Sequence, residues 1–119
     1  MYSTGNWTGF LLKQIIMNKQ EFKEKWLKGL RSGEYKQGKG QLRTKDGKYC
    51  CLGVAAVVNG MQMDRCGEGL LDEKGHFRGY NPIAKIIGDD NVGTLYQMND
   101  SMTDGKTFEE IADWIEKNI

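Results

Sequence analysis

The chain has 119 residues, of which 39% are hydrophobic and 28% are charged, and its formal net charge is +1. This length is enough for one domain with a single core and is too small for two. No apolar run approaches the roughly 20 residues that a membrane-spanning helix needs, so the sequence predicts a soluble protein with no membrane partner. Three cysteines, two of them adjacent, form no disulfide framework and indicate a reduced cytoplasmic setting.

Charge is distributed unevenly along the chain. Residues 18–49 contain ten Lys and Arg against four acids, a balance of +6. Residues 89–119 contain eight acids against two lysines, a balance of −6. This polarity suits subunits that meet basic end to acidic end, or a phosphate-binding face opposite a repelling one. Two solvated helix faces of opposite sign explain it equally well.

Residues 1–16 form an N-terminal extension to which the sequence assigns no role, and residues 17–119 are expected to form a single domain. A helix is predicted to begin after Asn18, an N-cap with Glu21 as its capping-box partner, and to stop at Gly33. Its apolar residues recur at helical spacing and predict one buried stripe. They are Phe22, Trp26, Leu27 and Leu30.

A glycine-rich stretch at residues 31–54 follows this helix, and we expect the rest of the chain to be organised around it. Asp46-Gly47 is a type I′ turn signal, so strands 41–45 and 48–51 are predicted to form a hairpin.

The remaining elements are short. They are a buried helix at 52–58, a hairpin around Lys74-Gly75, helices opening at Asn81-Pro82 and Val92, and a last helix capped by Thr107 and Glu110. The predicted fold class is α+β, a small domain with helices packed around a short antiparallel hairpin-based sheet.

The glycine-rich stretch combines exposed backbone with cations, which is the composition of an anion site. Gln37–Gly40 can present consecutive backbone N–H groups to a phosphate, with Lys39 and Arg43 close enough to add charge. Tyr35 and Tyr49 flank this loop and can stack on a nucleobase. The predicted ligand-binding residues are Arg31, Tyr35, Lys36, Gln37, Lys39, Arg43 and Tyr49.

Other interpretations of the same stretch stay open. It lacks the spacing of a P-loop or of a dinucleotide-binding loop, so no nucleotide-hydrolysing enzyme is indicated. A purely structural glycine-rich hairpin, with solvated lysines and with tyrosines in the core, has the same composition.

The cysteines suggest two further possibilities. Cys50 or Cys51 with His76 as base would make a small cysteine-dependent enzyme, although no residue that orients the base is identifiable. With Cys66 they provide four zinc ligands by type, but successive residues of an extended strand point to opposite faces. Adjacent cysteines that lead into an apolar helix are more often packed as small hydrophobes. We therefore predict no catalytic residue, no metal site and no cofactor.

Four motifs carry a resemblance to a known family. They are W-L-x-x-L-R-S-G-x-Y-x-Q-G-x-G-x-L-R at Trp26–Arg43, Y-C-C-L-G-V at Tyr49–Val54, L-Y-Q-M-N-D at Leu95–Asp100 and F-E-E-I-A-D-W-I-E at Phe108–Glu116. In combination they resemble a family of small accessory proteins of tailed bacteriophages, over nearly everything after Met17. Within it the chain is similar to phage sponge proteins of the anti-CBASS type. The resemblance implies an oligomer that sequesters a cyclic-nucleotide immune signal without cleaving it.

Loop chemistry and resemblance together predict a phage-encoded protein that captures a phosphorylated ligand, such as a cyclic dinucleotide, in the host cell cytoplasm. A homo-oligomer, dimer or tetramer, is expected because a two-fold interface suits a ligand with two phosphates and two bases. Trp7, Phe10 and Leu11 would add apolar surface to it. No duplex DNA partner is indicated. The alternatives are the cysteine-dependent enzyme, acting on a nucleotide or peptide, and an inhibitor that binds a host factor through the acidic C-terminal helix.

Overall fold

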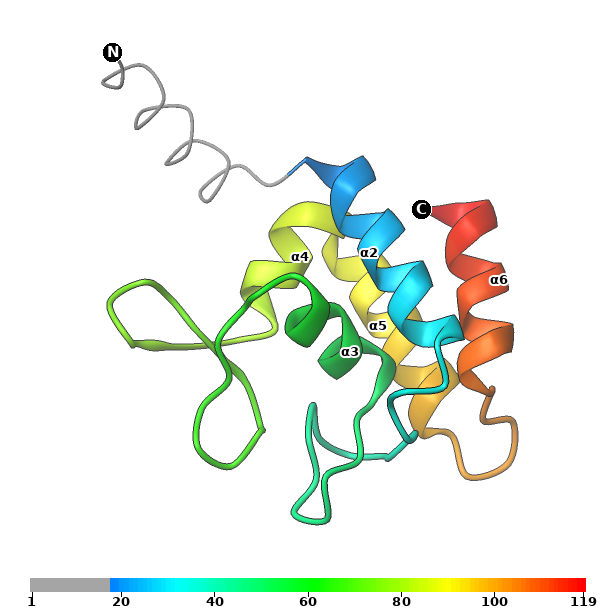
Figure 1. Ribbon diagram of the computed structural model, residues 1–119, viewed down its shortest axis with the longest axis horizontal. Helices are drawn as coiled ribbons and strands as arrows, with labels where there is room; N and C mark the ends of the chain where they lie inside the picture. The colour runs from blue at the N-terminus through cyan, green and yellow to red at the C-terminus, as the bar shows by residue number, and fades with distance from the viewer. Residues whose placement is uncertain (1–17) are drawn as a thin grey trace.

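The computed structural model describes residues 18–119, which contain helices and one two-stranded antiparallel sheet that lies to one side of them (Figure 1). This arrangement confirms the predicted α+β class. No helix of this part is long and apolar enough to cross a membrane. The predicted extension 1–16 lies outside the described residues. The elements are α2 (Lys19–Arg31), α3 (Cys51–Val58), β1 (Leu70–Leu71), β2 (Phe77–Gly79), α4 (Asn81–Ile87), α5 (Asp89–Asp100) and α6 (Phe108–Asn118).

Helix α2 begins where the sequence predicts, because the side chain of Asn18 accepts the backbone N–H groups of Gln20 and Glu21. It ends at Arg31, and Gly33 follows with a φ of 80°, a conformation that glycine adopts readily. Its apolar stripe packs on both α3 and α6, and Figure 1 shows α2 and α6 side by side. Trp26 is fully buried, and its indole N–H donates to the carbonyl of Cys51 at 2.9 Å.

Helix α3 is the buried helix predicted from the apolar run, and it starts one residue earlier, at Cys51. The Cys50 Sγ caps it by accepting the Gly53 N–H at 3.4 Å. A Cβ atom at Gly53 would lie only 1.9 Å from the carbonyl oxygen of Leu42. Glycine is therefore required here, because the loop that precedes the helix packs directly on its backbone.

The predicted hairpin of residues 41–45 with 48–51 is wrong, since the structure has no strand there. Tyr49 instead forms isolated bridges with both Gln37 and Arg43. The turn is also of another type. Thr44 accepts the Gly47 N–H at 3.0 Å and donates its own N–H to Lys48, while Gly47 has a φ of 81°. This is the pattern of a type I turn followed by a left-handed glycine, which closes a three-residue loop.

The hairpin predicted around Lys74-Gly75 is present as β1 and β2. The Asp72 carboxylate closes its turn by accepting the N–H groups of Lys74 and His76, both at 2.9 Å. These bonds lower the pKa of Asp72, with the one from His76 contributing most. Helix α6 has the predicted capping box, with Thr107 and Glu110 bonded reciprocally.

Candidate functional site

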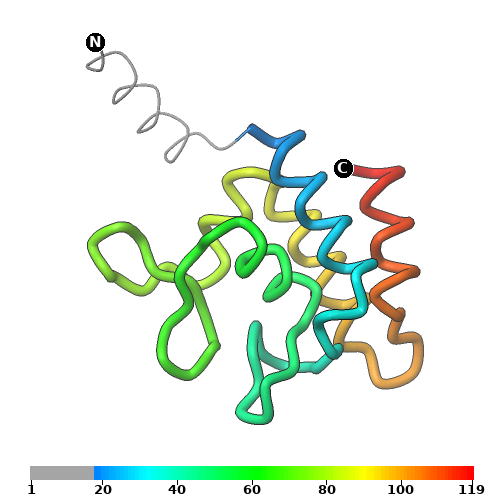
Figure 2. The backbone as a smooth tube through the Cα atoms, viewed as in Figure 1, coloured from blue at the N-terminus to red at the C-terminus, as the bar shows by residue number. Residues whose placement is uncertain are grey.

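The backbone groups predicted to bind a phosphate, Gln37–Gly40, bind other groups of the same chain. The Gly38 N–H donates to the carbonyl of Tyr49 at 2.7 Å, and the Gly40 N–H donates to Asp100 Oδ2 at 3.0 Å. The ammonium of Lys39 donates to the carbonyl of Ser101 at 2.9 Å. Figure 2 shows how this stretch reaches the segment that follows α5. The loop therefore does contact an anion, which is the carboxylate at the end of α5.

Asn99 organises this contact and was missed by the sequence analysis as a site residue. Its side chain is buried, with 1% exposed. Its Oδ1 accepts the Gln37 amide at 2.9 Å and the Cys51 N–H at 3.1 Å. Its Nδ2 donates to the Gly38 carbonyl and to Asp100 Oδ1, both at 2.8 Å. Every hydrogen-bonding direction of this amide is used, as a buried polar group requires.

The two tyrosines predicted to stack on a base form a packed pair. The ring centroids of Tyr35 and Tyr49 are 5.4 Å apart with an interplanar angle of 86°, an edge-to-face arrangement. Both rings are half-buried against the core. Lys36, between the loop and this pair, is exposed and accepts the Tyr49 N–H through its carbonyl. The structure thus offers no open aromatic platform at this pair.

Arg31 lies on α2 and bonds to α6 rather than to the glycine loop. Its guanidinium is 3.3 Å from Glu109, 2.8 Å from Asp113 and 3.1 Å from Glu116. The hydrogen bonds to Asp113 and Glu116 raise the pKa of Arg31 above its ordinary value. Opposite charges that were expected to pair between subunits therefore meet within one chain at this helix pair.

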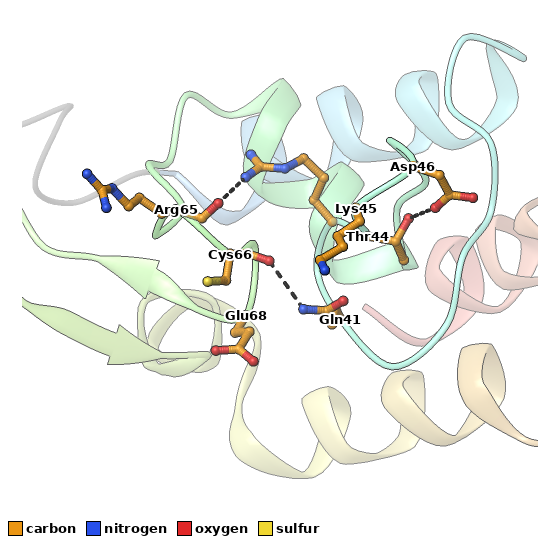
Figure 3. Close-up of a pocket in the computed structure, with 8 residues that line it drawn as sticks. Gln41, Thr44, Lys45, Asp46, Arg65, Cys66 and Glu68 are labelled. Atoms are coloured by element: carbon orange, nitrogen blue, oxygen red, sulfur yellow. Dashed lines mark hydrogen bonds between the residues drawn. The ribbon is translucent and has the colours of Figure 1, made fainter.

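Arg43 is the predicted ligand-binding residue that lines an open hollow, of about 690 Å³, between residues 41–46 and 65–68 (Figure 3). Arg43 Nη2 donates to the carbonyl of Arg65 at 3.0 Å, and the amide of Gln41 donates to the carbonyl of Cys66 at 3.2 Å. In Figure 3 the Arg65 side chain points away from Lys45 and Gln41. The lining residues are Gln41, Arg43, Thr44, Lys45, Asp46, Arg65, Cys66 and Glu68.

A second hollow, of about 350 Å³, lies beside the end of α5 and was not anticipated from the sequence. It is lined by Tyr96, Gln97, Asp100 and Ser101. The Tyr96 side chain is 39% exposed, and its ring centroid is 6.2 Å from that of Tyr80 at an angle of 44°. Burial raises the pKa of Tyr80 to about 12, so its hydroxyl stays protonated at neutral pH.

Cys50 and Cys51, the N-cap and first residue of α3, are buried, and the structure does not connect them to a base. Cys50 is 4% exposed and Cys51 is fully buried. Burial raises the pKa of Cys50 to about 11 and that of Cys51 well above its ordinary value. His76 lies in the exposed turn, 3.8 Å from the Asp72 carboxylate. Within residues 18–119, no three His, Cys, Asp or Glu side chains are arranged to hold a metal ion.

Comparison with known proteins identifies a family whose description names no function. No curated protein and no solved structure matches the chain. A family model described as a domain of unknown function, DUF8296, matches residues 17–77, just over half of the chain. The matched span contains α2, the glycine-rich stretch and α3. The chain belongs to the DUF8296 family.

Proposed function

We propose that this protein is a non-catalytic binding protein that sequesters a small phosphorylated molecule, such as a cyclic dinucleotide. The observation that carries the proposal is the hollow lined by Arg43 and Lys45. A phosphate there would meet the guanidinium of Arg43 and the ammonium of Lys45. The carboxylates of Asp46 and Glu68 also line the hollow, and the Thr44 hydroxyl donates to Asp46. Hydrogen bonds from charged donors to phosphate are about twice as strong as neutral ones, so a few of them can hold a small anion.

The hollow is a better candidate than the loop at Gln37–Gly40. A ligand at the loop would have to displace the Asp100 carboxylate from Gly40. At the hollow, Arg43 bonds to a single carbonyl through Nη2, and a guanidinium has five N–H donors. Lys45 is exposed. The hollow therefore offers donors that a ligand can reach without breaking the fold.

Sequestration without cleavage agrees with the protonation and burial of the Cys50 and Cys51 thiols. A cysteine nucleophile must be a thiolate, and the raised pKa values of Cys50 and Cys51 keep both protonated near neutral pH. Both lie under the surface, where a ligand cannot reach them. A captured nucleotide should then be recovered intact.

The test is calorimetry with a panel of cyclic di- and trinucleotides. We expect Arg43→Ala to weaken binding by about 1.5–3 kcal/mol, because charge-assisted hydrogen bonds are lost while the fold remains. Lys25→Gln, an exposed cation on α2, is the matched control and should bind like the parent. Equal affinity of Arg43→Ala and the parent would exclude this hollow.

The fate of the ligand is measured separately. The complex is heated to denature the protein, and the released ligand is weighed by mass spectrometry. An unchanged mass supports capture, whereas an altered mass would overturn the non-catalytic proposal.

The resemblance to phage sponge proteins supports three wider parts of the proposal: a phage origin, an anti-defence role in the host cytoplasm, and assembly as a dimer or tetramer. The two-fold symmetry of a cyclic dinucleotide is the physical reason for an even-numbered assembly. Light scattering coupled to size exclusion, with and without ligand, should give a mass above 13.5 kDa. A monomer at tens of micromolar under both conditions would contradict the assembly.

A further inference from the structure

The hollow beside α5 combines an aromatic side chain with a fixed hydrogen-bond acceptor. Tyr96 lines it with 39% of its side chain exposed, and the ring of Tyr80 packs behind it at 6.2 Å. Aromatic side chains of this kind stack on nucleobases whatever the base, because every base has a π-face. Tyr96 is thus placed to do what Tyr35 and Tyr49 cannot do while packed on each other.

The acceptor is the Asp100 carboxylate, which is held on both oxygens. Oδ2 accepts the Gly40 N–H at 3.0 Å and Oδ1 accepts the Asn99 amide at 2.8 Å. A carboxylate has about four lone-pair sites, so roughly one remains on each oxygen. None of the ion pairs within residues 18–119 involves Asp100. The two bonds hold the carboxylate in place and leave acceptor capacity on both of its oxygens.

This hollow and the hollow of Arg43 contact consecutive residues of the glycine-rich stretch. Gly40 binds Asp100, and the next residue, Gln41, lines the hollow of Arg43. Neighbouring Cα atoms are about 3.8 Å apart. Lys39 also reaches the rim, where its ammonium binds the carbonyl of Ser101. The base and the phosphate of one ligand would then lie on either side of residues 40–41.

We propose that the hollow of Tyr96 and Asp100 is the nucleobase subsite of the captured ligand and that it selects guanine. Guanine presents two adjacent donors, N1–H and the 2-amino group, on its Watson–Crick edge, which match the two acceptors of Asp100. Adenine, cytosine and uracil each place an acceptor beside their donor, and this acceptor would face a carboxylate oxygen. The inference rests on the proposed function and adds to it the base that the ligand contains.

The experiment compares cyclic di-GMP with cyclic di-AMP by calorimetry. The guanine ligand should bind at least about tenfold more tightly, the range of one good bidentate contact. Asp100→Asn should abolish this preference, because an amide offers one donor and one acceptor. Asp90→Asn, at the other end of the same helix, removes the same charge and should keep the preference.

Stacking is tested with a second set of variants. Tyr96→Ala should weaken both ligands by about tenfold, and Tyr96→Phe should restore binding, because the ring rather than the hydroxyl stacks. Phe77→Ala, which removes an exposed ring from β2, is the control and should change nothing. Melting temperatures of all variants show whether each one folds.

The outcomes separate this inference from the proposed function. Binding that depends on Arg43 but is equal for both bases, or is unchanged in Tyr96→Ala, would overturn the subsite and leave the phosphate site standing. A guanine preference that survives Asp100→Asn would place base recognition elsewhere. Failure of both dinucleotides to bind at millimolar concentration would overturn the guanine subsite, and failure of the whole panel of cyclic di- and trinucleotides would overturn the proposed function as well.

Discussion

The glycine-rich stretch has two halves with the same kind of composition and different surroundings. In residues 35–40, backbone and side-chain groups bind the end of α5 and Tyr49. In residues 41–48, Lys45 and Lys48 are exposed, and Arg43 borders an open hollow. The difference shows that glycines and cations together indicate an anion site. They do not tell whether the anion is a carboxylate of the same chain or a bound ligand. In the first half it is the chain's own Asp100. In the second half Asp46 pairs with Lys48 at 3.6 Å, while Arg43 and Lys45 border an open hollow.

The largest effect is expected from removing the amide that organises the first half. Asn99→Ala leaves the Cys51 N–H, the Gly38 carbonyl and the Gln37 amide without their buried partner. Each such loss costs about 1–3 kcal/mol, so the free energy of unfolding should fall by about 3–5 kcal/mol. Urea denaturation followed by circular dichroism measures it.

Gln97→Ala, an exposed amide on the same helix, is the matched control for this substitution. It should change the stability by less than about 0.5 kcal/mol. Comparable losses in the two variants would show that Asn99 does not organise the loop.

A smaller effect on the free energy of unfolding depends on pH. It concerns Cys50, a buried residue of the glycine-rich stretch. Its pKa is raised by burial from 9.0 to about 11, so the folded state favours the protonated thiol. The resulting stability is complete below pH 9 and is lost as the pH rises towards 11, by at most about 1.4 kcal/mol per pH unit. Urea unfolding at pH 8, 9 and 10 should show this decline.

Cys50→Ala isolates the contribution of the thiol, because Tyr80 titrates in both proteins. The variant should lose less stability than the parent between pH 9 and 10. Parallel pH profiles would contradict the assignment of the decline to Cys50.

The smallest effect compares two lysines, one from each half. Lys39→Ala removes the hydrogen bond to the Ser101 carbonyl and should lower the stability by about 0.5–1.5 kcal/mol. Lys45→Ala should leave it within about 0.5 kcal/mol, because this side chain is exposed. Thermal melts of the pair measure the difference. If Lys45→Ala proved the more destabilising, the contrast between the halves would be refuted.

The sequence predicts the helix ends well, but it does not predict which residues the loop at 37–40 binds. The reason is physical. Asn18 and Thr107 cap helices through residues two or three positions away, so the information is local. The partners of Gln37 and Gly40 are Asn99 and Asp100, about 60 positions along the chain. No local pattern encodes such a contact, although both residues belong to the L-Y-Q-M-N-D motif.

The candidate site shows the same limit. Arg43 is predicted from its place in the glycine-rich stretch, and it does line the hollow between residues 41–46 and 65–68. Arg31 was included because it is close in sequence, but the fold directs it to α6. Glu68 and the backbone of Arg65, which complete the hollow, come from a loop that sequence patterns do not pair with residues 41–46.

The packing of α2 on α6 has a consequence for when the protein can finish folding. The ammonium of Lys23 binds the carbonyl of Glu116 at 3.1 Å, and these residues are 93 positions apart. The buried face of α2 therefore stays incomplete until α6 has left the ribosome. Contacts so distant in sequence slow folding, since a long loop must close before they can form. The core of residues 18–119 is therefore completed only when α6 packs on α2.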